Sequence, residues 1–432
     1  MSVGLERLRA EPDLLRRAAA DKGEDPGLVD RAVELDERRR ELLGTGDELK
    51  AERNASSKRI GEAIRAGADP NGGEVAELKA ASVAAGERID AIDAELIEVE
   101  AALEDAMLRI PNPADPDVPV GGEEANEVVR TWGEPIPAEG RQPHWELAEQ
   151  LGLIDLVRGA KVTGSGFPVY LGAGSALQRS LISWFLDVHT REHGMTEVWP
   201  PVLVNADSAR GTGQIPDKED QMYVVTRDDL YLIPTAEVPV TNLHRDEIFE
   251  AGALPIRYAA YSASFRREAG AAGRDTRGIL RVHQFDKVEM VSFVAPGESE
   301  AELERLTAHA ETLLQRLGLA YRVVLMSTRE MGFVQARKYD LEVWAPGAER
   351  WLEVSSVSNF RDYQARRMAI RHRPEHAAKP ELVHTLNGSG LALPRTMAAL
   401  LETHQQPDGS IAVPEPLRPY LGGRERIGPP DA

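Results

Sequence analysis

One short stretch of the sequence combines arginines, carboxylates, an aromatic ring and glycines. It contains Phe265-Arg266-Arg267-Glu268-Ala269-Gly270, Gly273-Arg274-Asp275-Thr276-Arg277-Gly278 and Arg281-Val282-His283-Gln284-Phe285-Asp286-Lys287-Val288-Glu289-Met290. Runs rich in β-formers at 256–266 and 284–294 predict strands on either side of the glycine-rich part. Because side chains alternate along a strand, Phe285 and Glu289 share one face, and Arg266 and Glu268 likewise share a face. We therefore expect these four side chains to converge on one surface of a sheet.

Such a group of side chains suits a nucleotide. The ring can stack on a base, the arginine can pair with a phosphate through two hydrogen bonds, and the carboxylates can bind a metal, an amine or a hydroxyl. A charged hairpin with surface ion pairs accounts equally well for the spacing, so both interpretations stay open at this point. We interpret His283, within the same stretch, as a structural strand or loop residue.

A second signal lies near the C-terminus, in Leu386-Asn387-Gly388-Ser389-Gly390-Leu391-Ala392-Leu393-Pro394-Arg395-Thr396-Met397-Ala398. A strand or loop with two glycines leads there into a predicted helix whose first turn carries Arg395. An arginine beside the positive end of a helix dipole costs stability, and a bound anion offsets that cost. Arginines also occur at helix starts without an anion, so this signal supports the first one but does not stand by itself.

Residues 28–110 are predicted to form two long helices joined by a turn at 66–73, a dense run of helix breakers. The second helix has an apolar seam with alternating steps of three and four residues, in which only Ser82 is polar. The seam positions are Val75, Leu78, Ser82, Ala85, Ile89, Ile92, Leu96, Val99, Leu103, Ala106 and Ile110. The first helix repeats leucine at 28, 35, 42 and 49, with the less apolar Ala32, Arg39, Gly46 and Arg53 between them. We expect an antiparallel hairpin, because it buries both stripes.

The formal net charge of −20 argues against general binding to nucleic acid, which depends on clustered lysines and arginines. Any RNA contact must therefore use a local basic patch. The first arm helix offers one towards its tip, and the candidate RNA-binding residues are Arg53, Lys58, Arg59 and Arg65. The pattern alone favours a solvated coiled-coil surface; the alternative is a helix that faces an RNA backbone.

Prolines 111, 113, 116 and 119 with two following glycines predict a linker at 111–130, which separates an N-terminal domain (1–110) from a larger one (131–432). In the larger domain we predict helices at 175–193 and 299–317 and one starting at Pro394. Predicted strands lie at 197–204, 231–235, 256–266, 284–294, 321–326 and 351–357. Consecutive strands without a helix between them favour an antiparallel sheet. The predicted fold class is α+β: a helical coiled-coil arm followed by an antiparallel β-sheet domain flanked by helices.

Composition excludes several classes of protein. The chain has no cysteine, which excludes disulfides, thiolate metal ligands and a cysteine nucleophile. No apolar run is long enough to span a membrane, and the N-terminus lacks the apolar core of a signal peptide. We therefore expect a cytoplasmic protein without a membrane contact.

At this point the sequence resembles bacterial-type seryl-tRNA synthetases, members of the class II aminoacyl-tRNA synthetases. The likeness runs from the arm to Leu417-Arg418-Pro419-Tyr420-Leu421-Gly422-Gly423. The stretch from Phe265 to Phe285 matches the second class signature and Gly388–Arg395 the third. The helix that starts at Ser175, with the segment leading on to Pro200-Pro201, resembles the first, which forms the dimer interface in that family. The resemblance implies serine–tRNA ligase activity: serine is activated with ATP to seryl-adenylate and then transferred to tRNA(Ser), with tRNA(Sec) as a further candidate.

The resemblance also implies roles for single residues. Catalytic roles fall on Arg266 at the α-phosphate, on Glu268 and on Arg395 at the γ-phosphate. The implied ATP-binding set is Arg266, Arg267, Glu268, Val282, Phe285, Glu353, Val354, Ser355, Ser356 and Arg395, with Glu353 and Ser356 as magnesium ligands. The implied serine-binding set is Thr235, Ala236, Glu237, Glu289, Asn387 and Ser389. Zinc-dependent relatives use a cysteine ligand, so the implied ion is Mg²⁺ and not zinc. Arg267 stands where many relatives have a small polar residue.

Three alternatives remain from sequence. A duplicated synthetase that serves resistance or a biosynthetic pathway would share nearly all these residues. A carrier-protein ligase would keep the activation site and lose the arm. A non-catalytic coiled-coil RNA-binding scaffold would explain the arm but not the joint presence of Arg266, Glu268, Phe285, Glu353 and Arg395.

Overall fold

The computed structural model describes residues 3–269, 277–375 and 379–428. The chain divides into two compact units, Met1–Pro111 and Asn112–Ala432. No helix among the described residues is both long and apolar enough to cross a bilayer.

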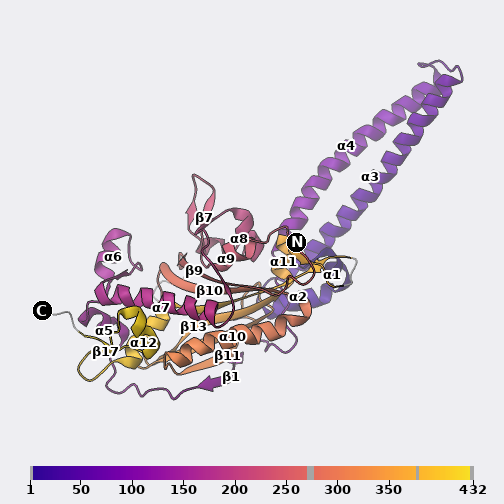
Figure 1. The fold of residues 1–432 in the computed structure, drawn as a ribbon. Helices are drawn as coiled ribbons and strands as arrows, with labels where there is room; N and C mark the ends of the chain where they lie inside the picture. Colours follow the sequence, from indigo (N-terminus) through magenta and orange to yellow (C-terminus); the bar gives the residue numbers. More distant parts are fainter. Residues whose placement is uncertain (1–2, 270–276, 376–378, 429–432) are drawn as a thin grey trace. The chain divides into compact units, whose positions relative to one another are not determined.

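In its described part, from residue 3 onward, the first unit consists of four helices (Figure 1). They are α1 (Leu5–Ala10), α2 (Pro12–Asp21), α3 (Gly27–Arg65) and α4 (Gly73–Leu108). The long pair α3 and α4 lies side by side and antiparallel, as the two apolar stripes predicted. All eleven seam positions are buried or half-buried. Gly46 of α3 faces Ile92 of α4 so closely that an added Cβ would lie 3.6 Å from its Cγ2 atom.

Ion pairs between the two long helices neutralise several cations in the part of α3 that precedes Arg53. Arg38 pairs with Glu95 at 2.7 Å, and Lys50 pairs with Asp93 at 3.3 Å. Exposed pairs of this kind each contribute about 0–1 kcal/mol. Towards the tip the pairing thins out: Arg59 reaches Glu74 at 3.3 Å, and Lys58 has no ion pair in the described part of the chain.

The second unit is built on an eight-stranded sheet in the order β1-β11-β12-β13-β16-β10-β9-β4. These strands are β1 (Glu127–Trp132), β11 (Tyr321–Leu325), β12 (Arg337–Ala345), β13 (Arg350–Arg361), β16 (His384–Ala392), β10 (Gln284–Val294), β9 (Ile256–Phe265) and β4 (Thr196–Val198). Every neighbouring pair is antiparallel except β4 with β9. The predicted α+β class with a largely antiparallel sheet is confirmed.

The remaining elements surround this sheet. The helices are α5 (His144–Gln150), α6 (Leu156–Val162), α7 (Gly172–Arg191), α8 (Ala206–Thr212), α9 (Glu237–Asn242), α10 (Ser299–Arg316), α11 (Tyr363–Met368) and α12 (Leu393–His404). The short strands are β2 (Ile154–Asp155), β3 (Val169–Tyr170), β5 (Leu203–Val204), β6 (Val224–Val225), β7 (Leu230–Leu232), β8 (Ile248–Phe249), β14 (Arg371–His372), β15 (Glu381–Leu382), β17 (Ile411–Ala412) and β18 (Arg426–Ile427).

Helices α7, α10 and α12 pack on one face of the sheet (Figure 1). Their apolar side chains, such as Phe185, Leu306 and Leu400, join Met290 and Val357 of the central strands in one core. On the other face, α9 and α11 cover only part of the sheet, through a smaller cluster that includes Val240, Val291 and Phe293. The rest of that face carries polar side chains of the central strands, several of which line cavities.

Several element boundaries differ from the sequence prediction; for example, β7 stops at Leu232 and not at Thr235, and β13 extends to Arg361 and not only to Val357. Helix α7 begins at Gly172, not at Ser175, and the residue just before it is fixed by a tertiary contact, in which Leu171 N–H donates to Leu153 O at 2.9 Å. The predicted strand 197–204 is two strands in different sheets, since Pro200 and Pro201 interrupt it. Strand β9 ends at Phe265, one residue before Arg266.

The stretch predicted as a linker packs within the second unit. The buried Asn112 amide donates to Val334 O at 3.0 Å and to Phe360 O at 2.9 Å. Residues 127–132 form the edge strand β1, which, like β12, was absent from the sequence prediction.

Candidate active site

Two adjoining cavities open on the polar face of the sheet, with empty volumes of about 630 and 1640 Å³. They share seven lining residues: Arg266, Glu268, Arg281, Lys287, Glu353, Ser356 and Arg395. Phe285, Val282, Val354, Ser355 and Ser389 line the first cavity, and Thr235, Glu237 and Asn387 line the second. The structure thus brings residues from five distant parts of the chain to one place.

Strand β10 directs alternate side chains towards this site. Phe285 and Lys287 line the first cavity. Val288 and Met290, at the even-numbered positions that follow, are buried in the core on the opposite face. Glu289 follows the same alternation and is fully buried behind the cavity wall. The strand period of two is therefore what presents an aromatic ring, an ammonium and a carboxylate on one face.

Arg266 and Glu268 reach the cavities from the turn after β9 and not from the strand itself. The guanidinium carbon of Arg266 lies 5.1 Å from the centre of the Phe285 ring, a cation–π contact. Glu268 has a φ of 51°, so the chain turns at this residue. Its carboxylate accepts from Arg281 Nη1 at 2.5 Å. The expected convergence of Arg266, Glu268 and Phe285 occurs, but a turn and not strand alternation places Glu268.

Arg395 stands in the first turn of α12 and points back at the sheet. Its Nη1 donates to the Glu353 carbonyl at 3.0 Å and lies 3.3 Å from the Glu353 carboxylate, while its Nε donates to Leu280 O at 3.1 Å. Burial by itself would raise the pKa of Glu353, but the charges of Arg395, Lys338 and Arg266 outweigh it and lower that pKa. Glu353 is therefore ionised at neutral pH, next to two fixed guanidinium groups.

Glu353 and Ser356 line both cavities because β13 has a bulge. Glu342 of β12 pairs with Glu353, but the adjacent Leu341 pairs with Ser355, so β13 carries one extra residue there. Ser355 turns its hydroxyl to Ser389 O at 2.6 Å. An oxygen pair from Glu353 and Ser356 suits Mg²⁺, which prefers oxygen ligands and is held by few protein groups.

The second cavity ends in a buried polar network. The Asn387 amide donates to Glu289 at 2.7 Å and to Glu237 at 3.1 Å, and Gln364 donates to Glu237 at 2.7 Å. Lys287 Nζ lies 2.6 Å from Glu289. Burial, together with the nearby charge of Glu289, raises the pKa of Glu237 to about 7. Two carboxylates beside one ammonium leave room for a second cation, so this end suits a small ligand with an amino group.

Some residues expected at the site do not line these cavities. The Arg267 side chain is exposed and donates to Asp220 O at 3.0 Å, and Ala236 is buried in the apolar cluster around Phe293. Glu289 contributes through Lys287 and Asn387, not as a cavity wall. His283 has a structural role, since its Nδ1 lies 3.0 Å from Arg266 O and its ring stacks on Phe167. Positions 270–276 of the glycine-rich loop lie outside the described residues.

Four residues of the site received no role from the sequence. Lys287 carried a readable signal, because it sits midway between Phe285 and Glu289 on the same face of β10. Arg281 pairs with Glu268, and Lys338 lies near Glu353. Gln364 on α11 gave no signal, since only the folded chain places it against Glu237.

The sequence of this chain matches those of known proteins along nearly its whole length. Residues 4–114 match the seryl-tRNA synthetase N-terminal domain, and residues 223–404 match the tRNA synthetase class II core domain of the G, H, P, S and T group. The serine–tRNA ligase of Thermomicrobium roseum is 55% identical over 99% of this chain and 95% of its own length. That of Salinibacter ruber is 53% identical over 97% of this chain and 98% of its own length.

Solved structures agree. The seryl-tRNA synthetase of Pyrococcus horikoshii, crystallised with ATP, superimposes with a TM-score of 0.92 at 37% identity, covering 99% of this chain and 100% of that one. The cytoplasmic serine–tRNA ligase of Naegleria fowleri, in complex with AMP, gives a TM-score of 0.86 at 29% identity, covering 98% and 97%. This chain belongs to the seryl-tRNA synthetase family of class II aminoacyl-tRNA synthetases.

Proposed function

We propose that this protein is a serine–tRNA ligase that activates L-serine with ATP and transfers it to tRNA(Ser). The observation that carries the proposal is the continuity of the two cavities through the shared residues Arg266, Lys287, Glu353 and Arg395. One end offers an aromatic ring and guanidinium groups to a nucleotide. The other offers buried carboxylates to an amino acid.

In the first step a serine carboxylate oxygen attacks the α-phosphorus of ATP, the bond to the β-phosphate oxygen breaks, and pyrophosphate leaves. The serine carboxylate is already a nucleophile at neutral pH, so the step needs positioning and charge neutralisation and not a side-chain base. We assign Phe285 to the adenine ring, Arg266 to the α-phosphate and Arg395 to the γ-phosphate. Arg395 is fixed by Glu353 and by Leu280 O, which keeps its guanidinium oriented before ATP binds.

Glu353 and Ser356 would hold Mg²⁺ in this proposal. Their fit rests on the ionised state of Glu353 and on the bulge that brings both oxygens to one wall. When bound, Mg²⁺ supplies charge neutralisation on the leaving pyrophosphate. We propose this ion, and not a cysteine-bound zinc, for the reaction cavity.

We assign serine to the end lined by Thr235, Glu237, Asn387 and Ser389, with Glu289 behind it. Ionised Glu237 pairs with the substrate ammonium, and Glu289 acts from behind the wall by holding Lys287 and Asn387 in place for the rest of the substrate. A pocket whose polar groups are arranged to bind a substrate hydroxyl strongly rejects alanine, because those groups would then lack that partner. A single extra methyl on threonine is rejected by only about 1–3 kcal/mol.

In the second step a hydroxyl of the terminal ribose of tRNA attacks the carbonyl carbon of seryl-adenylate, and AMP leaves. The hydroxyl proton is lost and a serine ester forms. We propose that Arg53, Lys58, Arg59 and Arg65 of α3 contact the tRNA backbone, since this half of the helix is less neutralised by α4 than the half nearer its start. We further propose that the protein is a cytoplasmic homodimer. This rests on helix α7, which corresponds to the first class signature, the dimer interface of that family.

Serine-dependent exchange of labelled pyrophosphate into ATP tests the activation step. We expect exchange with serine, weak exchange with threonine and none with alanine. Charging of purified tRNA(Ser) tests the transfer step, with tRNA(Sec) as a second candidate substrate. Exchange without charging would indicate a carrier-protein ligase, and the absence of both would indicate a scaffold. Light scattering tests the dimer.

A further inference from the structure

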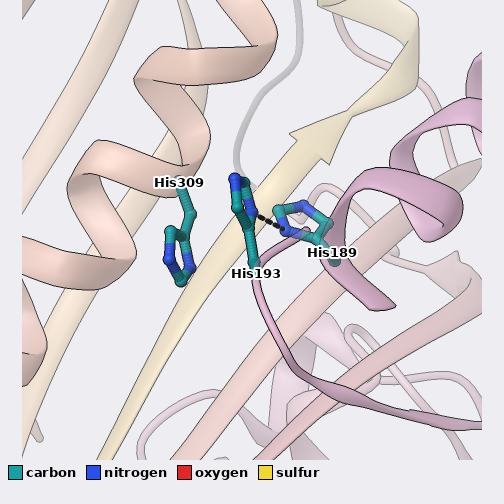
Figure 2. Close-up of side chains that lie close together, drawn as sticks. All are labelled: His189, His193 and His309. Atoms are coloured by element: carbon teal, nitrogen blue, oxygen red, sulfur yellow. Dashed lines mark hydrogen bonds between the residues drawn. The ribbon is translucent and has the colours of Figure 1, made fainter. Parts of the chain in front are cut away.

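Three histidines form a cluster that the proposed reaction does not use (Figure 2). They are His189 in the last turns of α7, His193 just beyond its end and His309 on α10. One ring nitrogen of each lies within 4.8 Å of those of the other two. None of the three lines the reaction cavities described above.

The end of α7 brings two of these side chains together. The backbone N–H groups of Glu192 and His193 both donate to Val188 O, at 3.0 and 3.1 Å, so the last turn continues to His193. Gly194 then adopts a φ of 70° and ends it. Residues four apart on such a turn lie on the same side. Accordingly, His189 Nδ1 lies 3.0 Å from His193 Nδ1.

The tautomer of His189 is fixed by its other nitrogen. His189 Nε2 lies 3.2 Å from Gly390 O, and a carbonyl oxygen only accepts, so Nε2 carries the hydrogen. The lone pair of the neutral ring is then on Nδ1, which faces His193. Only glycine fits at position 390 beside this ring, since a Cβ there would lie 2.2 Å from His189 Nε2. A histidine whose outer N–H donates to a carbonyl is the usual orientation of a metal ligand.

His309 supplies a polar atom without a partner. Its Nδ1 is buried and has no hydrogen bond among the described residues. Such an atom costs free energy unless something binds it. Neighbouring cations do not block a metal ion, because Arg316 pairs with Glu192 and Arg305 pairs with Glu302.

We propose that His189, His193 and His309 bind one Zn²⁺ ion. Imidazole nitrogens suit zinc, and three histidines plus a water complete its tetrahedral coordination without any cysteine. The His189 and His193 Nδ1 atoms, 3.0 Å apart, are slightly closer than the roughly 3.3 Å that separates two nitrogen ligands of one tetrahedral zinc ion, so the ion would take the place of the hydrogen that these two atoms share. The His193 and His309 rings are stacked at 3.9 Å between centres and 8° between planes. One of them must tilt to bring its lone pair onto the ion, and tilting His309 breaks no hydrogen bond at Nδ1.

The bound ion would join α7 to α10 and, through Gly390, to β16. Ser389 and Asn387 of that strand line the reaction cavities. The site therefore stabilises the packing beneath the serine end without taking part in the chemical steps. It is separate from the Mg²⁺ position at Glu353 and Ser356.

The test uses the full-length protein, freed of metal with a chelator and titrated with Zn²⁺ in the absence of ATP. We expect the wild type to bind one more equivalent of zinc than His309→Ala or His193→Ala. We also expect added zinc to raise the midpoint of thermal unfolding by several degrees in the wild type only. Co²⁺ as a probe should give the intense visible absorption of a tetrahedral nitrogen site. His372→Gln is the matched control, since His372 pairs with Glu381 in a different sheet, and it should bind like the wild type.

Retained pyrophosphate exchange in the histidine variants shows that they are folded. If His309→Ala does not fold, His309→Asn is used instead, because it removes less of the side chain. Glu353→Gln must keep the extra equivalent, which separates this site from zinc bound in the reaction cavity. Equal zinc stoichiometry in wild type and His309→Ala, or only octahedral Co²⁺ absorption in the wild type, overturns the proposal.

Discussion

Glu353 and Ser356 line the same cavities although they stand three residues apart on one strand. A regular strand would turn them to opposite faces. The extra residue that β13 carries opposite the Leu341–Glu342 step corrects the alternation, while Leu352 and Val357 stay in the core on the other face. The bulge thus brings two oxygen-bearing side chains to one wall of the cavities, where we propose that they hold Mg²⁺.

Glu353→Gln tests this pair. We expect serine-dependent pyrophosphate exchange to fall by on the order of 100-fold, and the Mg²⁺ concentration for half-maximal rate to rise, because the amide lacks the charge that holds the ion and orients Arg395. Glu342→Gln, directly opposite on β12 but paired with Arg322, is the control and should retain near wild-type exchange. An unchanged Mg²⁺ requirement in Glu353→Gln would remove Glu353 from the metal site.

Arg395→Ala and Arg395→Lys test the γ-phosphate assignment. Removing the guanidinium should lower exchange by about 100- to 1000-fold, as expected for the loss of one preorganised charge donor. Lysine should not restore it, because a point charge cannot span Glu353, Leu280 and a phosphate as the planar fork does. The measurement is the rate against ATP concentration. Arg426→Ala, which removes an exposed arginine paired with Asp408, should have no effect. Full activity of Arg395→Lys would contradict the need for a guanidinium at this position.

The pKa of Glu237 predicts a pH dependence of serine use. Burial and the charge of Glu289 raise this pKa to about 7, so the carboxyl is neutral below that pH and charged above it. Only the charged form pairs with the substrate ammonium. We therefore expect kcat/KM for serine, which reports the free enzyme, to rise from pH 6 to pH 8 and then level off. Glu237→Gln should have a low kcat/KM for serine throughout this pH range and should lack the rise. The same rise in this variant would assign it to another group.

The arm prediction is tested with two double variants. Lys58→Ala with Arg59→Ala should weaken tRNA charging and reduce the salt dependence of tRNA binding by about two units of slope, while pyrophosphate exchange stays unchanged. Arg38→Ala with Lys50→Ala removes the same charge from positions already neutralised by Glu95 and Asp93, and should change tRNA binding less. If exchange falls along with charging, or neither changes, the tRNA contact does not lie at Lys58 and Arg59.

The sequence was sufficient wherever structure follows from local periodicity. The three–four spacing of α4 predicted which positions are buried against α3, and the period of two in β10 predicted that Phe285 and Glu289 point the same way. Both patterns are properties of backbone geometry over a few residues, so no distant contact is needed to read them. The family resemblance added residues that no periodicity would have selected, such as Glu353.

Only the tertiary structure decided how these residues meet. The bulge in β13, the turn that carries Glu268, the outward position of Arg267 and the contact of Gln364 with Glu237 depend on which strands pair and in what register. The cluster of His189, His193 and His309 joins two helices more than a hundred residues apart, and its third member carries no mark in the sequence. Register and helix packing are settled by burial of the whole core, a sum over distant contacts that no local window contains.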